Sequence, residues 1–103
     1  DVVAYITTHF YNKLYINELA ASCRLSVSHF MHLFKEQTGL SPLAYQQALR
    51  MEYAKSALAS TNLSVSEISD RIGYTDPLYF SRIFKKITGF SPRAFRQNHC
   101  QGG

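Results

Sequence analysis

The sequence has little cysteine, no tryptophan and no long apolar run. Its two cysteines, Cys23 and Cys100, are too few for a disulfide framework, and a bridge between them is left open. We interpret Cys23 as a small buried hydrophobe, because it falls within an apolar helical pattern. No segment approaches the ~18 apolar residues of a membrane span, and the first residues do not resemble a secretory signal. These absences favour a protein of the reducing cytoplasm, with no membrane contact.

Residue patterns that carry catalysis are missing as well. The sequence contains no carboxylate pair, no activated nucleophile and no glycine loop suited to phosphate. His29 and His32 lie three residues apart and Cys23 is near in sequence, and such residues can bind zinc. A fourth ligand, which a structural zinc site needs, is not evident. We therefore predict that the domain is not an enzyme and that it has no catalytic residue, no cofactor and no bound metal.

A fifty-residue internal repeat is the main feature that is present. The stretch TGLSPLAY at 38–45 returns as TGFSPRAF at 88–95, and nine of the nineteen positions in 29–47 recur in 79–97. Upstream, INELAASCRL at 16–25 matches VSEISDRIGY at 65–74 with an offset of forty-nine. The chain is thus predicted to fold as two similar lobes.

The apolar periodicity in both copies is helical. Val27, Phe30 and Phe34 share one helix face, as do Phe80 and Phe84, and no alternating run suggests a strand. We predict an all-α fold of seven helices, at about 1–10, 16–22, 27–37, 42–59, 65–72, 77–87 and 92–98. The expected domain covers 1–98, with lobe one at about 1–41, a linker helix at about 42–59 and lobe two at about 60–98. Residues 99–103 are expected to form a disordered tail.

Local signals mark where these helices begin and end. Ser64 and Glu67 form a capping box, and Asp76 provides a capping acceptor before a proline at the first helical position. Ser41-Pro42 and Ser91-Pro92 repeat that second signal. Glycines 39, 73 and 89 suit the left-handed residue that ends a helix. On the long segment, an apolar stripe is predicted at Tyr45, Leu49, Tyr53 and Ala57.

Each copy reads as a helix-turn-helix, whose second helix lies in the DNA major groove. The net charge is +4, and five basic residues with no acid fall between Arg82 and Arg96. The outward faces of the two second helices supply the predicted base-facing residues: Ser28, Met31, His32, Leu78, Ser81 and Arg82. Basic residues near these faces supply the predicted phosphate contacts: Lys35, Lys85, Lys86, Arg93 and Arg96. The predicted partner is therefore double-stranded DNA.

The run EISDRIGYTDPLYFSRIFKKITGFSPRAFR at 67–96 resembles the signature of AraC-type bacterial transcription regulators, and 17–45 resembles that family's first helix-turn-helix. The resemblance implies two helix-turn-helix lobes on a connecting helix, reading successive major grooves. It implies the same six base-facing positions, and an activator that contacts RNA polymerase. It also implies an N-terminal effector or receiver domain in a longer protein, in keeping with a chain that begins at Asp1. The isolated domain is expected to be a monomer.

Three residues depart from the family pattern, and alternatives remain open. The family often has arginine at the position of His32 and alanine at that of Ser69, and Arg24 stands where the second copy has Gly73. Arg82 is alternatively a surface arginine paired with Asp70 or Asp76. The seven tyrosines are alternatively a platform for single-stranded bases. The alternative function for the whole chain is a helical protein-interaction module.

Overall fold

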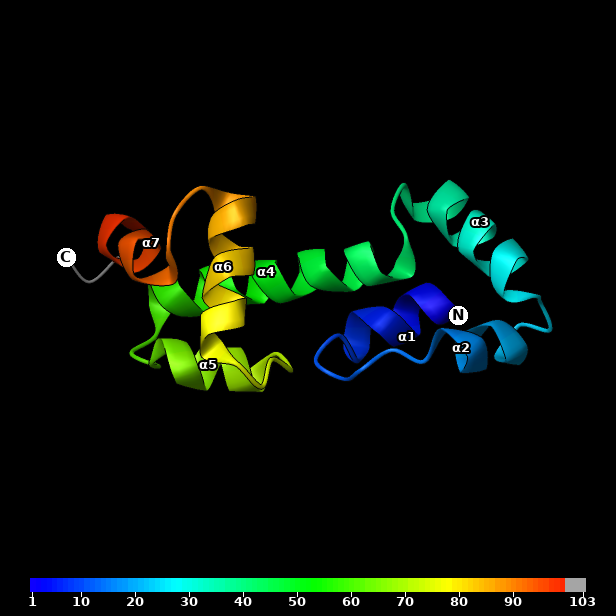
Figure 1. Cartoon of the computed structure of the whole chain (residues 1–103), viewed down its shortest axis with the longest axis horizontal. Helices are drawn as coiled ribbons and strands as arrows, with labels where there is room; N and C mark the ends of the chain where they lie inside the picture. Colours follow the sequence, from blue (N-terminus) through cyan, green and yellow to red (C-terminus); the bar gives the residue numbers. More distant parts are fainter. Residues whose placement is uncertain (100–103) are drawn as a thin grey trace. The chain divides into compact units, whose positions relative to one another are not determined.

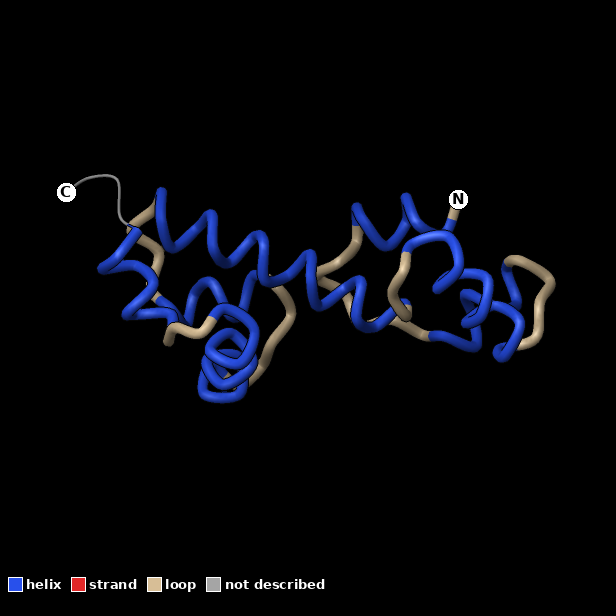
Figure 2. The backbone as a smooth tube through the Cα atoms, turned by 90° about the horizontal axis from the view of Figure 1, so that it is seen from above, coloured by secondary structure: helices blue, strands red, loops and turns tan. Residues whose placement is uncertain are grey.

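The computed structural model describes residues 1–99 of the 103-residue chain. Figure 2 shows helices joined by loops, and no strand occurs within the described range. The helices are α1 (Val2–Thr8), α2 (Ile16–Ser22), α3 (Val27–Thr38), α4 (Pro42–Ser60), α5 (Val65–Arg71), α6 (Pro77–Thr88) and α7 (Pro92–His99). The prediction of an all-α chain with seven helices is confirmed for residues 1–99, and most boundaries fall within one residue.

The chain divides into two compact units, one from Asp1 to Leu49 and the other from Arg50 onward. The first unit contains α1, α2, α3 and the first part of α4, while the second contains the rest of α4 with α5, α6 and α7 (Figure 1). In each unit a short helix packs against a longer one, as α2 against α3 and α5 against α6. The internal repeat thus corresponds to a repeated helix pair, and α4 contributes residues to both units.

The predicted capping signals are present in the structure. The Ser64 hydroxyl accepts from the Glu67 amide at 3.0 Å, and the Glu67 carboxylate accepts from the Ser64 amide at 2.9 Å. Hydrogen bonds to the Glu67 carboxylate, first from the Ser64 backbone amide and then from the Ser64 side chain, hold the pKa of Glu67 below its usual value. Their contribution to stability is therefore present above the unfolded-state pKa and is lost as the pH falls through the lower folded-state value.

The turns inside the two helix-turn-helix units have the same hydrogen bonding. In the first, the amides of Leu25 and Arg24 donate to the carbonyls of Ala20 and Ala21. In the second, Tyr74 and Gly73 donate to the corresponding carbonyls of α5. This is the Schellman motif, in which the residue after the helix adopts a left-handed conformation. Gly73 has φ +94°, and Arg24 has φ +59° as the alignment suggested.

Replacing Arg24 with glycine is expected to raise the free energy of unfolding by about 0.5–1 kcal/mol. A left-handed conformation costs an L-residue roughly 1–2 kcal/mol, and glycine avoids this while adding some unfolded-state entropy. Urea titration followed by circular dichroism measures the change. Gly73→Arg is the matched reverse substitution and should destabilise; equal stability of Arg24→Gly and wild type would show that this turn is unstrained.

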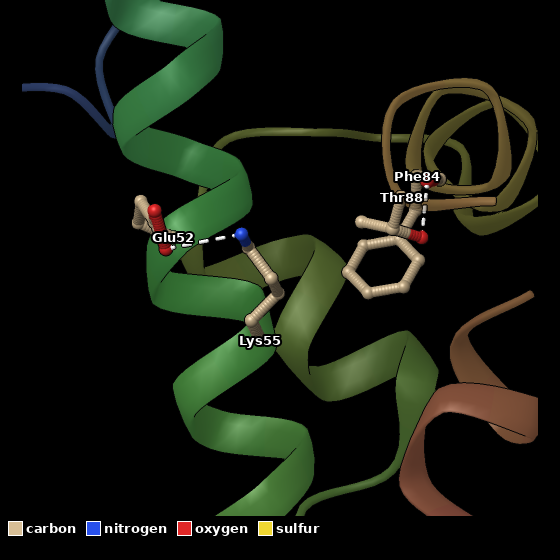
Figure 3. A network of polar contacts seen from close by, with 4 residues as sticks. All are labelled: Glu52, Lys55, Phe84 and Thr88. Carbon is tan, nitrogen blue, oxygen red and sulfur yellow. Dashed lines mark hydrogen bonds and ion pairs between the residues drawn. The ribbon is translucent and has the colours of Figure 1, made fainter. Parts of the chain in front are cut away.

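Each unit has its own aromatic core. In the first, Phe30 and Phe34 lie with Ile6, Leu14 and Ala20. In the second, Phe84 packs between Phe80 and Phe95, with ring centroids 5.8 and 5.4 Å away. Figure 3 shows the Thr88 hydroxyl donating to the Phe84 carbonyl, and also the ion pair between Glu52 and Lys55 on α4. The buried face of α6 is therefore fixed by aromatic packing, and its opposite face is left to solvent.

Three expectations are corrected by the structure. Cys23 is exposed, because it follows α2 at the turn instead of facing the core. In the predicted α4 stripe only Ala57 is buried, and Gln46 and Arg50 are buried in addition. His99 belongs to α7, with its ring stacked on Phe95 at 4.0 Å, so the expected tail does not include it. Cys100 and residues 101–103 lie outside the described residues. Within 1–99 no helix is long and apolar enough to cross a bilayer.

Candidate nucleic-acid interface

Capping interactions set the start of α6, which carries the second candidate recognition surface. The Asp76 carboxylate accepts from the Leu78 amide at 3.0 Å, and Pro77 occupies the first turn. Phe80 and Phe84 are completely buried, which fixes the rotation of the helix about its axis. The sequence therefore determines both where α6 begins and which of its faces is turned to solvent.

The outward face of α6 presents the predicted base-facing residues of the second unit. Leu78 is 71% exposed, Arg82 is exposed and Ser81 is half-buried. Within the described residues, Arg82 forms no ion pair with Asp70 or Asp76. A free guanidinium near the N-terminal half of a helix has the donor geometry that guanine O6 and N7 accept.

Basic side chains without intramolecular partners continue this surface. Lys85 and Lys86 on α6 and Arg93 on α7 are exposed, and within residues 1–99 their side chains form no hydrogen bond or ion pair. Charges of this kind contribute little to folding but interact strongly with phosphate. The second unit thus has a cationic face with no acidic side chain paired to it.

The corresponding face of α3 differs chemically. Ser28 and His32 are exposed, but Met31 is half-buried and packs against the core of the first unit. His32 Nε2 lies 3.0 Å from Glu36 Oε2, one helical turn further on. Lys35 is exposed and unpaired within the described residues. The first unit therefore presents a histidine in contact with a glutamate where the second presents Arg82 and Lys86.

Arg96, a predicted phosphate contact, has an intramolecular role in the structure. Its guanidinium donates to the carbonyls of Leu58 at 3.1 Å, Thr61 at 3.3 Å and Leu63 at 2.6 Å. Leu58 lies in the last turn of α4, and Thr61 and Leu63 follow it, at the helix end where a cation is favoured by the helix dipole. Sequence reasoning missed this role, although the repeat offers a signal for it. The repeat pairs Arg96 with Gln46, whose amide donates to the Asn12 carbonyl at 2.5 Å.

Another buried polar group was also missed. Arg50 is 9% exposed, and its guanidinium lies over the Tyr74 ring with 4.9 Å to the centroid. Ser69 is fully buried, and its hydroxyl donates to the Tyr74 carbonyl at 3.3 Å. Both contacts hold Tyr74, which ends the turn before α6. They position the recognition helix without being part of its outer face.

The described residues contain no group of three or more His, Cys, Asp or Glu side chains that could hold a metal ion. In particular, His29, His32 and Cys23, which the sequence raised as zinc ligands, do not form such a group. His32 is paired with Glu36 instead. The chemistry available on these surfaces is hydrogen bonding and charge, which suits recognition of a polyanion.

Comparison with known proteins agrees with this geometry. A family model described as "Helix-turn-helix domain" matches residues 19–98. The MmsAB operon regulatory protein of Pseudomonas aeruginosa is 41% identical over 99 residues, covering 96% of this chain and 32% of that protein. The arabinose operon regulatory protein of Escherichia coli is 39% identical over 97 residues, covering 93% of this chain and 33% of that protein. The chain thus spans about a third of these curated relatives.

Two solved structures are similar over nearly the whole chain. The C-terminal domain of AraT, a response regulator from Geobacillus stearothermophilus, has a TM-score of 0.87 and 33% identity, covering 95% of this chain and 82% of that one. The DNA-binding domain of AdpA, solved with a target DNA, has a TM-score of 0.86 and 30% identity, covering 94% of this chain and 87% of that one. The chain therefore belongs to the AraC-type family of helix-turn-helix proteins and is the DNA-binding domain of a transcription regulator of that type.

Proposed function

We propose that this domain binds double-stranded DNA in a sequence-specific manner by inserting α3 and α6 into successive major grooves. The observation that carries the proposal is the outer face of α6, where Arg82 is exposed and unpaired beside unpaired lysines. Bases are read by Ser28, Met31, His32, Leu78, Ser81 and Arg82. Phosphates are contacted by Lys35, Lys85, Lys86 and Arg93. Arg96 is left out of this set because its guanidinium is already hydrogen-bonded to three carbonyls.

The proposed setting is a longer bacterial regulator in the cytoplasm. The curated relatives are about three times as long as this chain, which leaves room for an N-terminal effector or receiver domain. One relative bears the name of a lactose operon transcription activator, which supports activation through contact with RNA polymerase. The domain itself acts as a monomer without a cofactor and without enzymatic activity.

Binding to random and selected duplexes over a salt series tests this function. Each phosphate that is neutralised should contribute about −0.9 to the slope of log K against log salt concentration. Lys86→Ala and Arg93→Ala should each weaken binding to all sequences alike and make that slope shallower by about 1. A salt-independent interaction, or none with duplex DNA, would favour a protein-interaction module instead.

Replacing Arg82 with alanine should lower the preference for one base pair by about tenfold, because a bidentate contact to guanine is lost. Selection of binding sites from a random pool, for wild type and variant, measures the change. Lys85→Ala, three residues further along the same helix, is the matched control and should leave the preferred sequence unchanged. If Arg82→Ala retains both affinity and preference, its proposed role is wrong.

Footprinting tests the use of both units. Two helices in successive major grooves should protect two patches about 34 Å apart, one turn of DNA. A single short patch would mean that one unit alone engages the duplex. We expect the second unit to dominate affinity, because Arg82, Lys85, Lys86 and Arg93 have no intramolecular partner within residues 1–99, whereas His32 in the first unit contacts Glu36.

A further inference from the structure

The ion pair on α3 lies where the repeat places two cations on α6. At an offset of fifty, His32 corresponds to Arg82 and Glu36 to Lys86. His32 Nε2 and Glu36 Oε2 are 3.0 Å apart, and their side chains are 73% and 64% exposed. An acid on a DNA-facing helix weakens phosphate binding, so a contribution to affinity does not explain Glu36.

The contact instead determines which hydrogen bonds His32 can offer to a base. A carboxylate only accepts, so Glu36 requires a proton on Nε2 of His32. In a neutral imidazole that proton leaves Nδ1 without one, and Nδ1 is then an acceptor. In a protonated imidazole Nδ1 also carries a proton and becomes a donor. Because Nε2 is engaged by Glu36, Nδ1 is the ring nitrogen that remains for a base, and it changes from acceptor to donor when the ring is protonated.

We propose that Glu36 is a specificity-determining positioning residue that makes base reading by His32 depend on pH. This inference rests on the proposed insertion of α3 into the major groove. With a neutral ring, Nδ1 accepts from the amino groups that cytosine and adenine present in that groove. With a protonated ring, Nδ1 donates to the acceptors of guanine and thymine and to adenine N7, and it can no longer accept from cytosine. The preferred base therefore changes, whereas at Arg82 it stays the same.

The charged and titratable groups around this pair lie on α3 and on the elements packed against it. Within residues 1–99, His32 and Glu36 form an ion pair with each other and with no third charged side chain. On α3 itself the neighbouring titratable groups are His29 and Lys35. The elements packed against α3 and their flanking turns carry further titratable groups: Asp1, Tyr5, His9, Tyr11, Lys13, Tyr15, Glu18, Cys23, Arg24 and Tyr45.

Site selection from a random duplex pool at two pH values tests the proposal. An imidazole changes its charge between about pH 5 and 8, so selections at the two ends of that range compare its two states. At the high end wild type should prefer cytosine or adenine at one position by about fivefold, and at the low end cytosine should be disfavoured there relative to guanine and thymine. That position is identified as the one whose preference changes in His32→Gln, a variant whose own preference should not depend on pH.

The decisive variant is Glu36→Gln. A glutamine amide can accept or donate, so it no longer fixes the proton on Nε2, and the preference at high pH should fall to less than about twofold. Both residues are exposed, so circular dichroism should show unchanged folding. An effect of Glu36→Gln on thermal stability alone, with the pH-dependent preference intact, would reduce the pair to a helix-stabilising contact and overturn the proposal.

The base pair that Arg82 is proposed to read distinguishes failure of this inference from failure of the proposed DNA-binding function. If its base preference persists at both pH values while the His32 position shows none, the proposed DNA binding stands and this inference fails. If neither position shows a preference, the proposed function itself fails.

Discussion

Replacing Phe84 with alanine is expected to lower the free energy of unfolding by about 3–5 kcal/mol. The Phe84 ring is fully buried and packs against Phe80 and Phe95, with an edge-to-face contact to the latter at 87°. Removing it leaves a cavity that rigid neighbouring helices cannot close. Because a small domain is stable by only about 5–15 kcal/mol, this change removes a large share of the second unit's stability.

Amide hydrogen exchange shows which helices lose stability in the variant. In Phe84→Ala, exchange should accelerate most in α5, α6, α7 and the part of α4 from Arg50 onward, which form one compact unit. Phe34→Ala is the matched variant, since Phe34 occupies the same place in the repeat and meets Tyr45 edge-to-face at 5.5 Å. That variant should affect α1, α2 and α3 first. Uniform acceleration in both variants would show that the two units unfold as one.

DNA binding should follow the same division. Phe84→Ala should abolish most affinity, because the cationic face of α6 depends on the buried face for its orientation. Phe84→Leu keeps most of the volume and should lose less than about 1.5 kcal/mol of stability, with base preference retained. Because Phe84 is fully buried, a loss of DNA binding in either variant reports the disordering of α6 and not the loss of a contact to DNA.

The helix boundaries were predictable because their signals are local. The Ser64 hydroxyl and the Asp76 carboxylate cap the residues that follow them, and neither interaction depends on the rest of the fold. The left-handed Arg24 was also predictable, because the repeat aligned it with a glycine. Burial was harder to predict. Cys23 fits an apolar pattern by type, yet the helix ends just before it and leaves the thiol exposed.

In the candidate site too, the sequence predicted which residues face outward but not which long-range contacts their side chains make. Periodicity placed Arg82, Lys85 and Lys86 on the outer face of α6, and all three are exposed. Periodicity could not show what a long side chain contacts across thirty or more residues of sequence. Arg96 reaches Leu63 in this way, and Gln46 reaches Asn12. Both contacts join the helix after the Gly-x-Ser-Pro turn to the loop before the helix-turn-helix, and only the tertiary structure brings these segments together.

Replacing Arg96 with alanine is expected to lower the free energy of unfolding by about 2–4 kcal/mol. Hydrogen bonds from a charged donor contribute roughly 1.5–3 kcal/mol each, and three carbonyls at and just after the C-terminal end of α4 lose theirs together. The estimate is below the sum because the side chain is half-buried and water can replace part of the interaction. Urea denaturation measures the loss.

The controls distinguish this role from phosphate binding. Arg93→Ala, on the same helix but exposed and unpaired, should change stability by less than about 0.5 kcal/mol and weaken DNA binding. Arg96→Lys keeps the charge but has no planar fork to reach three acceptors, so its stability should lie between wild type and alanine. A phosphate contact would give the opposite pattern, with stability unchanged in Arg96→Ala and affinity largely kept in Arg96→Lys. We expect instead that affinity falls in Arg96→Ala only to the extent that the second unit unfolds, because a guanidinium already bound to three carbonyls adds little to DNA binding.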